Sequence, residues 1–145
     1  MKKILVCLDG SPRQKGVLDA AIGLAKPTSA KLVLFRSVGV PSELPAEALS
    51  MAMEQVPVLL QQHAEKALVA LESSVPGELR GGVLVLIGTP WQAIEQAATE
   101  ADVDLIVVGS HGYGTLDRVL GTTAAKVVNH AARSVLVVRD AARLA

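Results

Sequence analysis

The sequence predicts an α/β fold, an open doubly wound sheet of five parallel strands with helices on both faces. Five short aliphatic runs recur along the 145 residues, and none of them alternates with polar residues. Segments with helical spacing lie between the runs. Strands that are covered on both faces by helices have this continuous Val, Ile and Leu character, and the alternation favours right-handed crossovers. We therefore expect residues 1–145 to form a single domain.

The expected strands are the aliphatic runs themselves. In chain order they are ILVCL (4–8), LVLF (32–35), VLVLI (83–87), LIVVG (105–109) and VLVV (135–138). In open α/β sheets, ligands bind at the carboxyl ends of strands, where the strand order reverses. The candidate ligand loops therefore begin at Asp9, Ser37, Gly88 and Gly109.

Two segments carry signals for the start of a helix. Ser11 and Pro12 precede one apolar stripe, which we expect to end at Pro27, and Thr89 and Pro90 precede another. Serine and threonine cap a first turn, and proline is tolerated at the first helical position. The inward positions are expected to be Val17, Leu18, Ala21, Ile22, Leu24 and Ala25 in the first helix, and Ile94, Ala97 and Ala98 in the second.

Residues 39–81 are less regular. A long helical tract, residues 45–74, contains Pro57. Proline removes a helical hydrogen bond and clashes with the preceding turn, so we expect a break or kink near Val56. Met51 and Met53 are expected to fill gaps in the packing.

Charge and hydropathy exclude several classes of protein. Fourteen basic and fourteen acidic residues cancel, and the basic ones are scattered, which disfavours binding to nucleic acid or to an anionic membrane. No apolar run reaches the roughly 18 residues of a membrane span. The first run stops at Asp9, too early for a signal peptide. We expect a soluble, cytoplasmic protein.

Cysteine and histidine give no sign of a metal site. Cys7 is the single cysteine, and its place in an apolar run favours a small core residue over a reactive thiol. His63, His111 and His130 lie far apart and lack the spacing of paired metal ligands. We expect no metal site built by the protein.

A glycine-rich stretch follows the fourth run. VVGSHGYGTLDRVLGTT, residues 107–123, contains four glycines and ends where a helix is expected to begin. Glycine lets a ligand approach the backbone, and a helix N-terminus presents unpaired N–H groups, so phosphate is the predicted occupant. One of Thr122 and Thr123 can cap the helix while the other donates to a phosphate oxygen. The alternative is that the glycines only shape a tight surface loop.

Five segments make essentially the whole chain resemble the universal stress protein family. They are KKILVCLDGS, LVLFRSV, IGTPWQAI, ADVDLIVVGSHG and GTTAAKVVNHAARSVLVVR. Nucleotide-binding members of that family carry G-x2-G-x9-G-(S/T), which holds the phosphates and ribose of ATP. Gly109, Gly112, Gly121 and Thr122 match these positions, with eight residues instead of nine between the second and third glycines. The resemblance implies ATP as the ligand, with Mg²⁺ brought by its phosphates, and the strand order 3-2-1-4-5.

The resemblance also implies two contacts with the nucleoside. It places Asp9 against the ribose and the backbone of Ser37 against adenine, although Arg36 stands where histidine is common. A carboxylate accepts hydrogen bonds from two hydroxyl groups, and the alternative for Asp9 is a turn aspartate. His111 and Thr123 complete the predicted nucleotide-binding set. No partner completes a catalytic unit with His111, so no catalytic residue is predicted.

The resemblance further implies that the fifth strand lies at a sheet edge. An apolar edge strand without proline invites pairing, so we expect a homodimer through Val135, Leu136, Val137 and Val138. The leading hypothesis is an ATP-binding stress-response regulator. The alternatives are a dimeric stress scaffold that binds no nucleotide and a slow ATPase, for which no arginine finger is identifiable.

Overall fold

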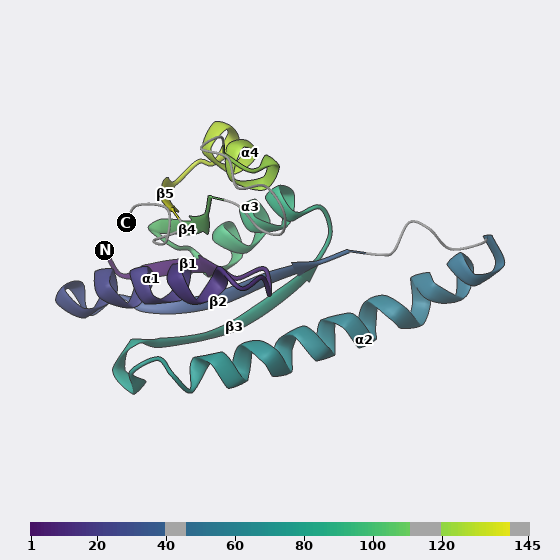
Figure 1. Cartoon of the computed structure of the whole chain (residues 1–145), viewed down its shortest axis with the longest axis horizontal. Coiled ribbons are helices and arrows are strands. Elements are labelled where there is room, and N and C mark those ends of the chain that lie inside the picture. Colours follow the sequence, from purple (N-terminus) through teal and green to yellow (C-terminus); the bar gives the residue numbers. More distant parts are fainter. Residues whose placement is uncertain (40–45, 111–119, 140–145) are drawn as a thin grey trace.

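Strands and helices alternate along the chain from the first residues onward (Figure 1). The computed structural model describes residues 1–39, 46–110 and 120–139, and within 46–56 it describes the backbone alone. The elements are β1 (Lys3–Cys7), α1 (Gln14–Thr28), β2 (Lys31–Val38), α2 (Ala46–Glu72), the 3-10 turn η1 (Gly77–Leu79), β3 (Arg80–Ile87), α3 (Pro90–Ala101), β4 (Leu105–Gly109), α4 (Thr122–His130) and β5 (Ser134–Val138).

The strands form one five-stranded sheet in the order β3-β2-β1-β4-β5. Each neighbouring pair is parallel, and the central strand β1 places Val6 opposite Leu34 of β2 and Val107 of β4. The order reverses next to β1, so the carboxyl ends of β1 and β4 border a crevice. The predicted fold class is confirmed.

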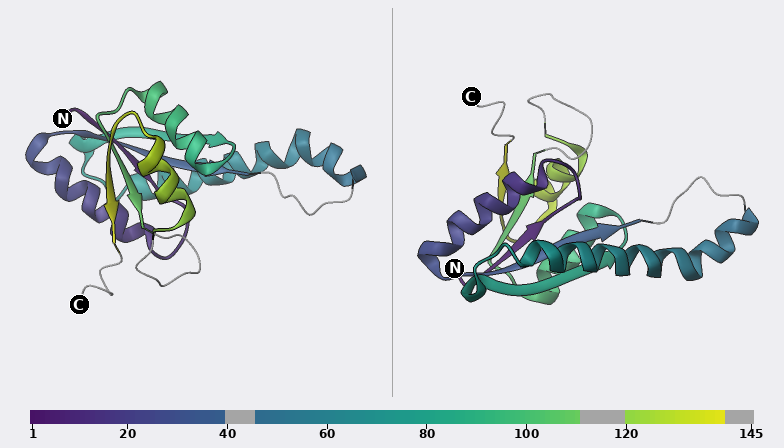
Figure 2. Two further views of the ribbon diagram at one scale, coloured as in Figure 1. Left: turned by 90° about the horizontal axis from the view of Figure 1, so that it is seen from above. Right: turned by 60° about the horizontal axis from the view of Figure 1, so that its bottom comes forward.

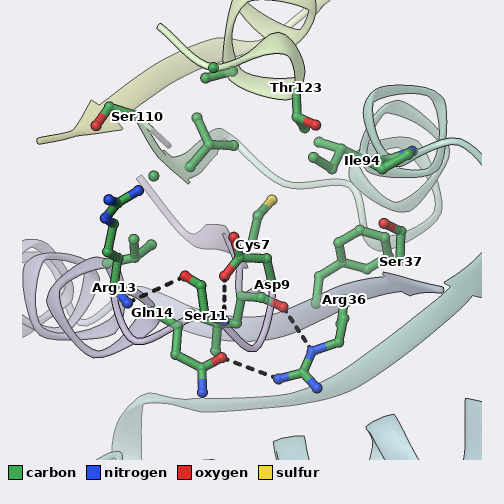
Figure 3. A pocket seen from close by; sticks show the side chains of 18 of the residues that line it. Cys7, Asp9, Ser11, Arg13, Gln14, Arg36, Ser37, Ile94, Ser110 and Thr123 are labelled. Atoms are coloured by element: carbon green, nitrogen blue, oxygen red, sulfur yellow. Dashed lines mark hydrogen bonds between the residues drawn. The ribbon is translucent and has the colours of Figure 1, made fainter. Parts of the chain in front are cut away.

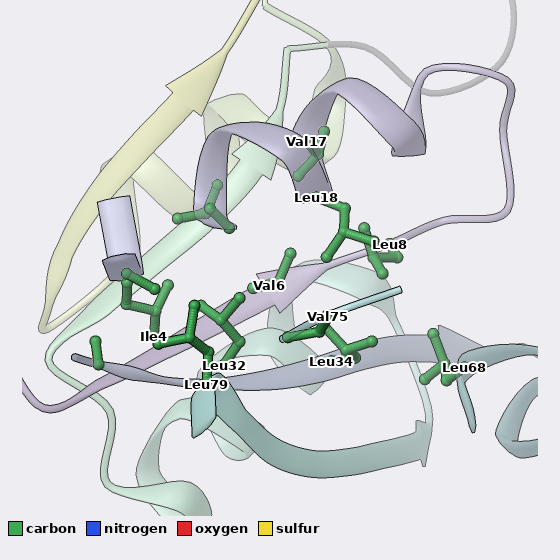
Figure 4. Packing of buried hydrophobic residues seen from close by; sticks show 14 of the residues in the cluster. Ile4, Val6, Leu8, Val17, Leu18, Leu32, Leu34, Leu68, Val75 and Leu79 are labelled. Carbon is green, nitrogen blue, oxygen red and sulfur yellow. The ribbon is translucent and has the colours of Figure 1, made fainter. Parts of the chain in front are cut away.

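Two apolar clusters cover the two faces of the sheet. Alternate residues of β1 point to opposite faces, so Ile4 and Val6 join one cluster while Leu5 joins the other. Val17 of α1 and Leu68 of α2 belong to the first cluster (Figure 4). The second cluster takes its helical members from α3 and α4. The helices of the two clusters therefore sandwich the sheet, as Figure 2 shows from two sides.

Helix α1 differs from the prediction at both ends. It begins at Gln14, because residues 11–13 form a turn in which the Ser11 carbonyl accepts from the Gln14 N–H at 3.1 Å. Ser11 is therefore not the N-cap. Pro27 lies inside the last turn and does not end the helix. The helix ends one residue later, before Ser29, which adopts the left-handed conformation with φ of 56°.

Helix α2 runs without interruption through Pro57, so of the predicted break or kink near Val56 the break is wrong. Its carboxyl-terminal half is held against the sheet by buried Ala64 and Leu68, which offsets one missing hydrogen bond. The amino-terminal half extends beyond the carboxyl ends of β2 and β3 (Figure 1). The packing predicted for the methionine side chains lies outside the described residues. Among the described residues, no helix has the length and apolar character needed to cross a bilayer.

Candidate functional site

A cavity of about 490 Å³ lies at the carboxyl ends of β1, β2 and β4, between the first turns of α1 and α4 (Figure 3). This volume falls within the range of small-molecule sites, about 300–1,000 Å³. The position agrees with the general rule for ligands of open α/β sheets.

The cavity wall collects most of the predicted site residues. The structure places Asp9, Ser37, Gly109, Gly121, Thr122 and Thr123 there. His111 and Gly112 lie outside the described residues. Segments as far apart in the sequence as Asp9 and Thr123 therefore meet around one space, because the carboxyl ends of parallel strands lie on the same side of the sheet.

The N-terminus of α4 is open toward this cavity. Its N-cap is Gly121, which has extended backbone and offers no side-chain cap, so the predicted cap by a threonine hydroxyl is wrong. The Gly121 N–H donates to the Ser110 carbonyl at 2.7 Å. The N–H groups of Thr122 and Thr123 have no partner within the helix, because they belong to its first turn. No acidic residue lies in that turn, so the helix itself supplies no negative charge to offset the positive end of its dipole, which faces the cavity.

On the opposite side, the turn after β1 presents Asp9. Its Oδ1 accepts from the Ser11 N–H at 2.9 Å, so the turn role considered for this aspartate is present. The side chain is nevertheless exposed and lines the cavity. Gly10 follows with φ of +81°, a conformation that favours glycine. The bend thus fixes one carboxylate oxygen and leaves the other toward the cavity.

Arg36 and Gln14 connect this turn to β2 and α1. Arg36 Nε donates to the Leu8 carbonyl at 3.0 Å, and Nη2 donates to Gln14 Oε1 at 3.1 Å. The same Gln14 oxygen accepts from the Gly10 N–H at 3.0 Å. The prediction from sequence missed both side chains as site residues. The available signal was Arg36 itself, which stands beside Ser37 in place of the histidine common in the resembling family.

The remaining wall is largely apolar. Pro90 and Ile94 of α3 face the ends of β1 and β2, near Phe35 and Cys7. Cys7 packs against the second apolar cluster, as predicted for a small core residue, and it is half-buried because it also lines this wall. Burial raises the pKa of its thiol. Among the described residues, no group of three or more His, Cys, Asp or Glu side chains could hold a metal ion.

The sequence model of the Universal stress protein family matches residues 1–139. The chain belongs to this family. Its membership agrees with the parallel five-stranded sheet and with the strand order that the resemblance implied.

Members of the universal stress protein family align with this chain over nearly its full length. Universal stress protein Sll1388 from Synechocystis sp. is 32% identical, over 94% of this chain and 97% of that protein. The structure of universal stress protein UspA from Lactobacillus plantarum superposes with a TM-score of 0.81 at 27% identity, covering 95% of this chain and 97% of that one. A universal stress protein solved in complex with cAMP gives a TM-score of 0.60 at 25% identity, over 94% and 95% of the two chains.

Proposed function

We propose that this chain binds ATP, accompanied by Mg²⁺, in the cavity between β1 and β4, and acts as a cytoplasmic stress-response regulator. In this proposal residues 1–145 work as a single nucleotide-binding domain. The observation that carries the proposal is the open N-terminus of α4 in the wall of a cavity of about 490 Å³. A relative solved with cAMP supports an adenine nucleotide as the ligand.

The phosphates belong at the α4 end of the cavity. The free N–H groups of Thr122 and Thr123 and the helix dipole favour an anion there, and the threonine hydroxyls add donors. Gly109 brings the backbone of β4 to the same wall. In the proposed complex the predicted residues His111 and Gly112 also contact the nucleotide. Mg²⁺ is held through the phosphate oxygens, since the described residues provide no acidic cluster for it.

The nucleoside belongs at the other end. The free oxygen of Asp9 is an acceptor for ribose hydroxyls. The apolar wall that includes Ile94 and Pro90 suits the flat face of adenine, with the backbone of Ser37 at its edge. The proposed function is binding, because the described residues around the phosphate end include no activated nucleophile or general base.

Direct binding measurements test the proposal. Protein purified without added nucleotide is denatured, the released small molecules are chromatographed, and thermal unfolding is recorded with ATP, AMP and cAMP. ATP at about a hundred times its Kd stabilises the folded state by about 2.7 kcal/mol, enough to raise the Tm by several degrees. Absence of any released nucleotide and of any Tm shift would overturn the proposal in favour of the scaffold. Steady phosphate release would instead indicate an ATPase.

A matched pair of substitutions tests the phosphate end. Thr122→Asp places a negative charge in the first turn of α4, where it favours the helix by about 0.3–1 kcal/mol but repels phosphate. Thr122→Asn is the neutral control. We expect the aspartate variant to unfold at the same or a higher temperature while binding ATP at least about tenfold more weakly, a loss of about 1.4 kcal/mol. Equal ATP affinity in the two variants would place the phosphates elsewhere.

We also propose a homodimer formed by antiparallel contact of two β5 strands. The residues concerned are Val135, Leu136, Val137 and Val138, at one edge of the sheet. Leu136 is 36% exposed although it is apolar. An edge strand with an exposed apolar residue and no proline is open to pairing with a second copy.

A further inference from the structure

We propose that Arg36 and Gln14 are positioning residues that hold Asp9 ready for the ribose, so that they set the preference of the cavity for ribonucleotides over deoxyribonucleotides. This inference rests on the proposed nucleotide binding. It concerns the bend between β1 and α1 and the strand β2 beside it. Neither residue is assigned contact with the nucleotide itself.

The guanidinium of Arg36 takes over a backbone interaction at the point where β1 ends. The Leu8 N–H still donates to the Phe35 carbonyl at 2.8 Å, which continues the ladder with β2 by one residue. In an unbroken parallel ladder, the Leu8 carbonyl would next accept from the N–H of Ser37. It accepts from Arg36 Nε instead, at 3.0 Å. The backbone of β1 can therefore turn away, and the N–H of Ser37 is left on the cavity side of β2.

Gln14 stabilises the bend between β1 and α1 on the side of Gly10. Its Oε1 accepts from Arg36 Nη2 at 3.1 Å and from the Gly10 N–H at 3.0 Å. A Cβ on Gly10 would lie 3.4 Å from the guanidinium carbon, so the bend packs directly against the planar group. The residues on both sides of Asp9 are thus tied to one cation, through the Leu8 carbonyl and the Gly10 N–H.

This arrangement orients Asp9 without neutralising it. The salt bridges of the described residues do not include a pair between Arg36 and Asp9, so the Asp9 carboxylate is not engaged in an ion pair with the nearby guanidinium. Its Oδ1 is held by the Ser11 N–H at 2.9 Å. An acceptor whose position is fixed before binding avoids the ordering cost on complex formation, and a hydrogen bond to a charged acceptor is stronger than a neutral one.

The planar fork of arginine is required for this role. It donates at once to two acceptors on different elements, whereas a lysine ammonium behaves as a flexible point charge. Glutamate at position 14 keeps an acceptor for both donors, while methionine keeps the length of the side chain and removes the acceptor. The chain therefore offers a conservative and a disruptive substitution at each position.

The test is the ratio of affinities for ATP and its deoxy analogues, measured by isothermal titration calorimetry with ATP, 2′-deoxyATP and 3′-deoxyATP. We expect the wild-type protein to prefer ATP by about tenfold or more. Arg36→Met and Gln14→Met are expected to reduce this preference below about threefold, Arg36→Lys to give an intermediate value, and Gln14→Glu to retain it. The ratio of ATP to AMP affinity, which reports on the phosphate end, is expected to change little in any variant.

The outcomes separate this inference from the proposed function. Thermal unfolding without nucleotide shows which variants fold, and a merely structural role would lower the Tm while leaving the ribose preference intact. ATP binding with wild-type preference in both methionine variants would overturn the positioning role. ATP binding by the wild type with no ribose preference would also overturn it and leave the proposed function standing. No nucleotide binding by the wild type would overturn both.

Discussion

At the scale of single residues, Asp9 combines two tasks in one side chain. One oxygen closes the turn by accepting from the Ser11 N–H at 2.9 Å, and the side chain as a whole lines the cavity. A neutral amide at this position keeps an acceptor for the turn but loses the charge. The turn and the proposed ribose contact can therefore be separated experimentally.

Asp9→Asn is expected to weaken ATP binding by about tenfold, because hydrogen bonds to a charged acceptor contribute more than neutral ones. Isothermal titration calorimetry measures the affinity, and urea unfolding measures the stability, which we expect to change by less than about 0.5 kcal/mol, as for most exposed substitutions. Undiminished ATP affinity would mean that Asp9 serves the turn alone.

Cys7 provides a second prediction at this scale. Burial raises the pKa of its thiol, and the thiolate is the form that reacts with alkylating agents. At about pH 8, Cys7 is therefore expected to react with iodoacetamide about tenfold or more slowly than glutathione, and more slowly again when ATP fills the cavity. Mass spectrometry follows the reaction without ambiguity, since the chain has a single cysteine. Labelling as fast as that of glutathione would contradict the burial of the thiol.

At the scale of elements, Asp104 ties the start of β1 to the start of β4. Its Oδ2 accepts from the N–H groups of Lys2 and Lys3, at 2.6 and 2.9 Å, and its own N–H donates to the Lys3 carbonyl at 2.9 Å. The N–H groups of Lys3 and Lys2 hold the pKa of this carboxyl below its ordinary value. The ionised form is thus the one that the folded state favours.

The stability contributed by Asp104 depends on pH in a defined direction. A lowered pKa in the folded state stabilises the fold above the unfolded pKa of about 3.9, and this contribution is lost as the pH falls through the folded value. Asp104→Asn is therefore expected to lower the urea midpoint near neutral pH and to match the wild type in strong acid. A difference between the two proteins that stays constant across this range would show that the charge is not responsible.

The sequence predicted these elements unequally well. The buried strands were predictable because an aliphatic run covered on both faces has little choice of environment, and Leu5 and Ile106 are indeed fully buried. The helices were less predictable. Ser11 belongs to a turn that precedes α1, and α2 continues through Pro57 because the packing of the rest of that helix stabilises it. The unusual residue at position 36 was visible in the sequence, but its role was not predictable, because the hydrogen bonds of Arg36 connect residues that only the folded sheet brings together.

At the scale of the whole molecule, the two edges of the sheet differ. Gln61 of α2 donates to the Val85 carbonyl of β3 at 3.0 Å, so a side chain already uses one backbone hydrogen-bond acceptor of that edge strand. The β5 edge carries Leu136, which is 36% exposed. This difference favours β5 as the edge that pairs with a second copy.

Leu136→Lys is expected to convert the proposed dimer into a folded monomer, because a charge on an edge strand opposes pairing and this position is already exposed. Size-exclusion chromatography with light scattering at micromolar concentration measures the mass. Val69→Lys, at a 56% exposed position on α2, is the control and should stay dimeric. A monomeric mass for the wild-type protein would contradict the proposed β5 interface.

The hydrogen bond from the Gly121 N–H to the Ser110 carbonyl joins the two residues that border the segment 111–120. The two ends of this segment are therefore held at one fixed spacing, whatever the number of residues between them. The entropy of closing a chain segment varies only logarithmically with its length. A segment one residue shorter than the family pattern is therefore compatible with unchanged positions of the Thr122 and Thr123 amides, where the proposal places the phosphates.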